Sequence, residues 1–135
     1  MINLSKKVKG DVAELAVAKK LMADGWKILF PYGEDHRYDL VVEKANRFVK
    51  IQVKYVTPKN GAIDINCQSS NNWSILPYNS EEIDVIAAYN SKNEEIYFVS
   101  ALEMNHRSFK LRIEGAKNNQ KSKIHLAKNF SELKI

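Results

Sequence analysis

The segment RYDLVVEKANRFVKIQVKYV, residues 37–56, decides the fold of this chain. It contains two runs rich in β-branched residues, Tyr38–Glu43 and Phe48–Val56, on either side of a short polar stretch. Two such runs joined by a few polar residues are typical of a β-hairpin. The segment therefore predicts two neighbouring antiparallel strands near the centre of the fold.

The turn of this hairpin determines which residues face one another. If Lys44 lies opposite Arg47, then Asp39 lies directly opposite Gln52, on one face of the sheet. Lys54 shares that face because side chains alternate along a strand, and its Cα is expected about 5–8 Å from that of Asp39. A shift of one residue would expose the alternating valine and isoleucine side chains of the second strand, so the pattern favours this register.

A helix is predicted from about Lys7 to Asp24, where alanine, leucine, methionine and lysine dominate, and Gly25 is a suitable terminator. Glu14 falls on the same stripe as small and apolar residues of this helix. Burying a carboxylate there is costly without a partner, so we expect a cation, either Lys54 or a metal ion, beside Glu14.

The rest of the chain is predicted to be mainly strands. Strands are expected at residues 26–30, 62–67, 83–89, 95–100 and 109–113, a long polar loop at 68–79 and a helical turn at 101–105. Asp84 interrupts an apolar strand and is expected to have a structural role at its edge. This order predicts a single α+β domain, residues 1–135, with the N-terminal helix packed on a mixed or antiparallel β-sheet.

Four side chains are therefore expected to converge: Glu14, Asp39, Gln52 and Lys54. Two carboxylates, the Gln52 amide oxygen and the Val53 backbone carbonyl are suitable ligands for a hard divalent cation, Mg²⁺ or alternatively Mn²⁺. Lys54 would stabilise the attacking water or the charge that develops on a phosphoryl oxygen. Taken singly, each residue is more often structural, but their convergence favours metal-assisted phosphodiester hydrolysis.

The charge of the chain agrees with a polyanionic partner such as double-stranded DNA. The formal net charge is +5, and lysines that neutralise phosphates release counterions. The basic residues gather near the two ends of the chain, and amide side chains suited to DNA contacts lie among them and in the polar loop. The candidate DNA-binding residues are Lys9, Gln68, Asn71, Asn72, Lys117, Asn118, Lys121 and Lys123.

Other features exclude several classes of protein. The apolar runs are too short to span a bilayer, and the first residues lack the apolar segment of a secretory signal. The single cysteine, Cys67, cannot form an internal disulfide or a cysteine-rich zinc site. We therefore expect a soluble, cytoplasmic protein.

Three segments carry a resemblance to the PD-(D/E)XK nuclease superfamily, which has the restriction-endonuclease-like fold. Residues 9–15, KGDVAEL, resemble the helix with that family's glutamate; residues 37–42, RYDLVV, resemble the strand with its aspartate; and residues 51–55, IQVKY, resemble the strand with its (D/E)-X-K pair. Tyr38 stands where the family has proline. Gln52 replaces the second acid, which removes one negative charge and favours a single metal ion.

Glu14, Asp39, Gln52 and Lys54 together resemble the branch that contains bacterial group I intron homing endonucleases. That resemblance implies cleavage of double-stranded DNA by a homo-oligomer, a dimer or a tetramer, because one active site cuts one strand. Two alternatives remain open. One is a structure-specific nuclease similar to Holliday junction resolvases, and the other is a DNA-binding module that has kept the fold without the reaction.

Overall fold

The computed structural model describes residues 2–70, 75–77, 80–103, 108–114 and 124–134. Its first element is the helix α1, Lys6–Ala23. Ser5 caps the helix because its hydroxyl accepts a hydrogen bond from the Val8 backbone N–H at 3.2 Å. Gly25, with φ +95°, lies just past the C-terminal end. The predicted helix is therefore confirmed to within one residue at each end.

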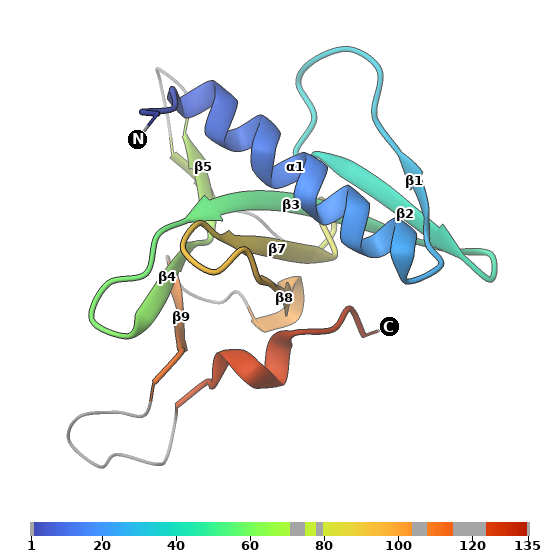
Figure 1. The fold of residues 1–135 in the computed structure, drawn as a ribbon. Coiled ribbons are helices and arrows are strands. Elements are labelled where there is room, and N and C mark those ends of the chain that lie inside the picture. Colours follow the sequence, from blue (N-terminus) through green and yellow to red (C-terminus); the bar gives the residue numbers. More distant parts are fainter. Residues whose placement is uncertain (1, 71–74, 78–79, 104–107, 115–123, 135) are drawn as a thin grey trace.

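Within the described residues, five strands form one sheet in the order β1-β2-β3-β7-β8 (Figure 1). Their bounds are β1 Lys27–Leu29, β2 Leu40–Lys44, β3 Arg47–Val56, β7 Val85–Asn90 and β8 Ile96–Ser100. β3 and β7 are parallel, and the other neighbours are antiparallel. The prediction of an α+β fold with a helix on a mixed sheet is confirmed.

The β2–β3 hairpin has the register that the sequence predicts. Lys44 pairs with Arg47 and Leu40 pairs with Ile51. Ala45 and Asn46 have φ of 52° and 63°, the left-handed conformation that a two-residue hairpin turn requires. The turn and the buried face of β3 therefore specify the same pairing, which leaves Gln52 and Lys54 on the opposite face.

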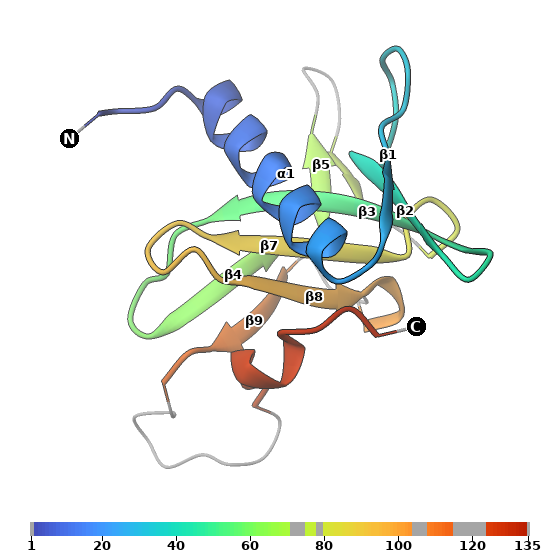
Figure 2. The same ribbon diagram turned by 45° about the vertical axis from the view of Figure 1, so that its right-hand side comes forward.

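The central sheet is covered on both faces, as the two views in Figures 1 and 2 show. The helix α1 packs on one face through the fully buried side chains of Ala13, Val17 and Leu21. On the other face, β4 (Ala62–Asn66) pairs with β9 (Ser108–Arg112) and closes a second apolar cluster. This second layer holds β3 from the side on which Lys54 lies.

The prediction of a loop throughout residues 68–79 is wrong in part. β5, Gln68–Ser70, pairs antiparallel with β6, Ile75–Pro77. The serine-rich and asparagine-rich composition indicates a loop, but backbone pairing does not depend on composition alone. The described residues also include two short 3-10 helices, η1 at Ala101–Glu103 and η2 at Ala127–Phe130, and the sequence predicts only the first of them.

Asp84 has the structural role expected of it. Its carboxylate accepts a hydrogen bond from the Lys50 backbone N–H at 2.8 Å, and its own N–H donates to the Lys50 carbonyl at 2.9 Å. It thereby ties the start of β7 to β3. None of the helices in the described part of the chain is long and apolar enough to cross a membrane.

Candidate active site

Asp39 lies where the β2–β3 ladder ends. Its backbone N–H donates to the Ile51 carbonyl at 2.8 Å, and its carboxylate accepts a hydrogen bond from the Val53 N–H at 2.7 Å. This second bond takes the place of the next backbone pair of the ladder. Because β2 begins at Leu40, the edge of β3 beyond that point faces the side chain of Asp39 rather than another strand.

The Val53 carbonyl points to the same edge as the Val53 N–H, because both groups of a strand residue face the same side. It lies on the side of Asp39, and the Gln52 amide nitrogen approaches it at 3.4 Å. That contact is at the long limit of a hydrogen bond. Rotating the amide by 180° would place the Gln52 oxygen beside the carbonyl oxygen, an arrangement that a cation stabilises.

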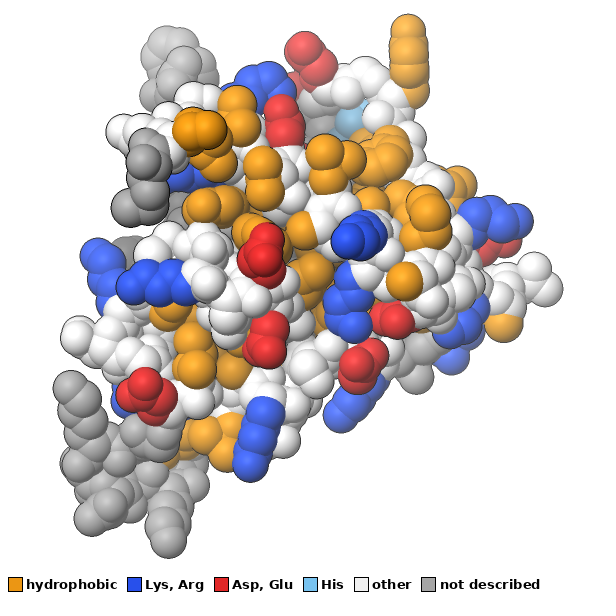
Figure 3. All heavy atoms as spheres, in the orientation of Figure 1, with side chains coloured by type: hydrophobic (Ala, Val, Ile, Leu, Met, Phe, Trp, Pro, Cys, Tyr) orange, Lys and Arg blue, Asp and Glu red, His pale blue; other side chains and the backbone are white. Residues whose placement is uncertain are grey.

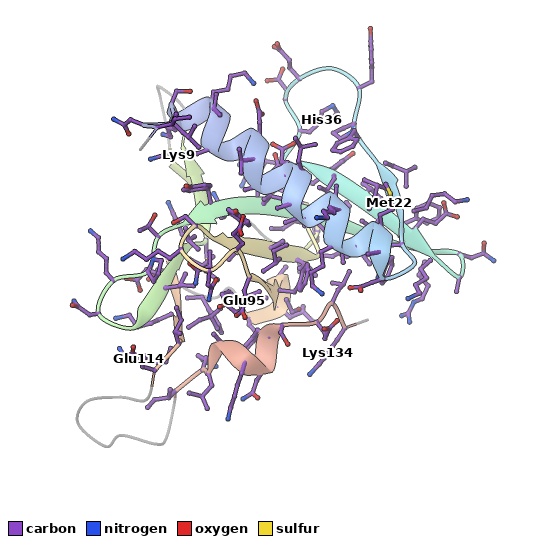
Figure 4. All side chains as sticks on the ribbon, in the orientation of Figure 1. Lys9, Met22, His36, Glu95, Glu114 and Lys134 are labelled. Carbon is purple, nitrogen blue, oxygen red and sulfur yellow. The ribbon has the colours of Figure 1, made fainter. Side chains whose placement is uncertain are left out.

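Glu14 reaches the same region from the helix. Glu14 and Asp39 both line a cavity of about 300 Å³ whose other wall is the loop between β1 and β2, including Pro31, His36 and Tyr38. In Figure 4, His36 marks this loop, which stands beside α1. His36 itself is exposed, and its ring contacts the Tyr32 carbonyl at 2.9 Å. The helix and the hairpin therefore bring two carboxylates to one cavity.

The charge state of Glu14 is strongly perturbed. Burial, with further contributions from the charges of Asp39 and Asp11, raises the pKa of the Glu14 carboxyl from 4.5 to about 7, whereas Lys7 acts in the opposite direction. Two acids that repel each other in a cavity are stable only when one is protonated or a cation joins them. The pair therefore favours a bound cation at neutral pH.

Asp39 and Lys54 form the other half of the cluster. Burial raises the pKa of Asp39, while the Val53 N–H and the Lys54 charge lower it. Burial lowers the pKa of Lys54, and the negative charge of Asp39 is the largest influence that raises it. The expectation that Lys54 accompanies Asp39 is therefore supported by their mutual attraction, although the charges that act on Glu14 are mainly those of other acids.

The donor set fits a hard divalent cation. It combines the Glu14 and Asp39 carboxylates with the Val53 carbonyl and the Gln52 amide, all oxygen donors. In the described part of the chain, no three histidine, cysteine, aspartate or glutamate side chains gather into a metal cluster by themselves. Backbone and amide oxygens, completed by water, would therefore have to supply the remaining ligands, as is common for Mg²⁺.

Arg37, the first residue of the RYDLVV segment, is a basic residue near the site to which the sequence pattern assigns no role. The Arg37 Nε lies 2.9 Å from a Glu82 carboxylate oxygen, and its positive charge lowers the pKa of Lys54. Arg37 precedes Asp39 by two residues, so alternation along a strand could have placed both on one face. Its pairing with Glu82, however, depends on a segment distant in sequence.

The candidate DNA-binding residues are only partly described. Lys9 lies near the N-terminal end of α1 (Figure 4), and its Nζ is 5.7 Å from the centre of the Tyr55 ring. Gln68 belongs to β5. The other six, Asn71, Asn72, Lys117, Asn118, Lys121 and Lys123, lie outside the described residues.

Replacing Glu14 with glutamine is expected to remove a pH-dependent penalty on folding. The pKa of Glu14 is about 7 in the folded state and near 4.5 otherwise, so the folded state binds more protons between these values. The contribution of Glu14 to the free energy of unfolding is therefore fully present below about pH 4.5 and is lost as pH rises towards 7. In EDTA, the melting temperature of Glu14→Gln should match wild type at pH 5 and exceed it by several degrees at pH 8.

The matched control for that experiment is Glu103→Gln, which changes an exposed glutamate in η1. Its melting temperature should follow that of wild type at both pH values. A difference between Glu14→Gln and wild type that is the same at pH 5 and pH 8 would contradict the perturbed state of Glu14.

Comparisons with known proteins agree with this geometry. The family model for PD-(D/E)XK endonucleases matches residues 4–133. A solved structure described as that of a bacterial homing endonuclease, I-Ssp6803I, is similar with a TM-score of 0.71 and 26% sequence identity, over 88% of this chain and 84% of that one. No curated protein matches the chain.

Proposed function

Because the chain belongs to the PD-(D/E)XK endonuclease family, we propose that it is a metal-dependent endodeoxyribonuclease that hydrolyses phosphodiester bonds of double-stranded DNA. The observation that carries this proposal is that the Asp39 charge acts on both Glu14 of α1 and Lys54 of β3, and that burial displaces the pKa values of all three residues. Displaced pKa values cluster at functional sites. The similarity to a homing endonuclease favours duplex DNA as the substrate.

We assign separate roles to the residues of the site. Asp39 and Glu14 would hold a divalent cation, Mg²⁺ or Mn²⁺, together with the Val53 and Gln52 oxygens. The cation would supply charge neutralisation at the scissile phosphate. The Val53 N–H orients the Asp39 carboxylate, since it donates to Asp39 at 2.7 Å. This fixed orientation reduces the reorganisation that cation binding would otherwise need.

Lys54 is proposed to act on the substrate directly. Its ammonium group would orient the attacking water or donate to a phosphoryl oxygen as negative charge develops there. Partial burial strengthens such an interaction because the local dielectric is lower than that of water. Burial lowers the pKa of Lys54, and the Asp39 charge opposes this by favouring the protonated form.

The N-terminal half of α1 supports a role in holding the DNA backbone. Lys6 acts electrostatically on Lys54, and Lys7 acts on Glu14, so both charges lie near the site. Lys9 follows on the next turn. Together with the net charge of +5, these lysines would attract phosphates, and binding should weaken steeply as salt concentration rises.

The experiment that tests this function is incubation of the protein with supercoiled plasmid in Mg²⁺, in Mn²⁺ and in EDTA. We expect nicking or linearisation with either metal and none in EDTA. Since cleavage of both strands needs two sites, we also expect a homo-oligomer. Binding without cleavage in any metal would contradict the enzymatic proposal.

A second substrate distinguishes the two kinds of nuclease. A duplex-cleaving enzyme should cut linear duplex DNA at particular sites, because its specificity depends on base contacts and on the shape of the duplex. A four-way junction of unrelated sequence should be cut no faster than its linear arms. Cleavage confined to the junction would replace duplex cleavage by a resolvase-like activity.

A further inference from the structure

Arg37 forms an ion pair that crosses the strand carrying Lys54. Arg37 precedes β2, whereas its partner Glu82 precedes β7, and β3 lies between these two strands in the sheet. The Lys50 ammonium donates to the Glu81 carbonyl at 2.6 Å. Lys50 and Lys54 share one face of β3, so the segment before β7 lies on that face. The Arg37 guanidinium is therefore held over the face of β3 that carries Lys54.

Glu82 fixes the Arg37 side chain through its Nε atom. The distance from Nε to the Glu82 carboxylate oxygen is 2.9 Å, and Nε itself is buried. The whole side chain is nevertheless 21% exposed, so other atoms of it reach solvent. Glu82 is held in turn, because Asp84 is hydrogen-bonded to the Lys50 backbone. The protein therefore orients the guanidinium before any ligand binds.

Arg37 also adds positive charge beside Lys54. Besides burial, the charges of Arg37 and Lys6 lower the pKa of Lys54, whereas the charge of Asp39 raises it. A divalent cation held by Asp39 would offset that carboxylate, and positive charge would then dominate around Lys54. Like charges kept close together are stabilised by an anion placed between them. A DNA phosphate is the anion that the proposed substrate brings to this place.

On the face drawn in Figure 3, basic side chains are interspersed with acidic ones. Positive charge on that face therefore acts through individual side chains rather than through one broad basic surface. A guanidinium is well suited to such a local role, because its five N–H donors form a planar fork. One edge of the fork can meet a carboxylate while other donors reach a phosphate oxygen, which the point charge of an ammonium group does not reproduce.

We propose that Arg37, held in place by Glu82, is a second phosphate-binding residue of the active site. Its terminal amino groups donate to a non-bridging oxygen of the phosphate that Lys54 contacts, and Glu82 is a positioning residue. The proposal rests on the nuclease function proposed above and deepens it by adding a contact with the substrate. Because DNA binding is measured without cleavage, failure of this contact and failure of the nuclease function are distinguishable.

The salt dependence of duplex binding in Ca²⁺ tests the contact itself. The slope of log K against log salt concentration should become shallower by about 0.9 in Arg37→Gln, because one phosphate contact is lost. Arg47→Gln is the matched control, since Arg47 is an exposed arginine at the β2–β3 turn. It lies seven residues before Lys54, about 23 Å away along β3, and should keep the wild-type slope. A wild-type slope in Arg37→Gln would overturn the proposed contact.

Single-turnover cleavage with Mg²⁺ tests what the contact does in the reaction. Arg37→Gln should cleave about 10²-fold more slowly than wild type, as expected for one donor to a developing negative charge. Arg37→Lys should keep the salt slope and still cleave more slowly than wild type, because an ammonium group lacks the planar fork. Arg47→Gln should cleave as wild type does. A wild-type rate in Arg37→Gln would overturn the proposal.

The double variant Arg37→Gln/Glu82→Gln separates a phosphate contact from an ion pair that serves only the fold. Its melting temperature should be near that of wild type, because neither charge is left without its partner. Its cleavage rate and salt slope should remain those of Arg37→Gln. Recovery of the wild-type rate and slope by the double variant would overturn the proposal. A wild type that cleaves no DNA, with a shallower slope in Arg37→Gln, would overturn the nuclease function and retain the phosphate contact.

Discussion

Replacing Lys54 with alanine is expected to reduce metal-dependent cleavage of plasmid DNA by about 10²–10³-fold, the effect typical of losing one donor to a developing negative charge. DNA binding should be retained, because most of the binding free energy comes from contacts with backbone phosphates. The measurement is the single-turnover cleavage rate with Mg²⁺, together with an electrophoretic mobility shift assay in Ca²⁺ or EDTA.

Two further variants isolate the role of the Lys54 charge. Lys54→Met keeps most of the side-chain volume and should be as inactive as Lys54→Ala, which would exclude lost packing as the cause. Lys50→Ala is the matched control on the same strand and face, since the Lys50 ammonium donates to the Glu81 backbone carbonyl outside the site. It should cleave within a few-fold of wild type. Equal cleavage by wild type and Lys54→Ala would remove Lys54 from the mechanism.

Replacing Asp39 with asparagine is expected to abolish cleavage, because the substitution removes the charge that acts most strongly on both Glu14 and Lys54. We expect a loss of about 10³-fold or more, as several kcal/mol of charge stabilisation disappear. The fold should persist, since the asparagine amide oxygen can still accept the hydrogen bond that Val53 N–H gives to Asp39. Cleavage rate and melting temperature, measured on the same preparation, separate these effects.

The control for this variant is Asp64→Asn, which alters an exposed aspartate of β4 that pairs loosely with Lys110 at 3.9 Å. It should leave both the cleavage rate and the melting temperature near wild type. If Asp39→Asn cleaves DNA while Asp64→Asn does not, the proposed site is in the wrong part of the molecule. Unfolding of Asp39→Asn would assign Asp39 a structural role instead.

Burying the ionisable side chains of the site lowers the stability of the folded protein. Glu14, Asp39 and Lys54 each have a pKa displaced in the direction that burial imposes on a charged group, so the charged forms are destabilised there. A structure selected for stability alone would expose or replace them. A bound cation and a phosphate would offset this cost of burial, which agrees with the proposed nuclease site.

Local sequence patterns predict the parts of the fold that local interactions determine. The alternation of Val49, Ile51 and Val53 and the turn at Ala45–Asn46 predict the β2–β3 register, and both act within the hairpin itself. The helix is likewise predicted by its composition and by Gly25. The observed pairing ends at Leu40–Ile51, one residue short of the expected Asp39–Gln52 pair. Asp39 meets β3 instead through the Ile51 carbonyl and the Val53 N–H.

Features that depend on distant contacts were not predictable in the same way. The parallel pairing of β3 with β7 joins residues more than thirty positions apart, and no local pattern specifies which strands become neighbours. The pairing of β5 with β6 was not predicted, because the composition of this segment is typical of loops. The ion pair between Arg37 and Glu82 also requires the tertiary fold, so the sequence shows a basic residue there but not its partner.

The central claim is that Glu14 and Asp39 hold a divalent cation beside Lys54. The most direct measurement is anomalous diffraction from crystals soaked in Mn²⁺. The account predicts a peak between the Glu14 and Asp39 carboxylates, within coordination distance of the Val53 carbonyl oxygen. A peak elsewhere on the chain, or a Glu14 side chain directed into bulk solvent with no peak beside Asp39, would contradict it.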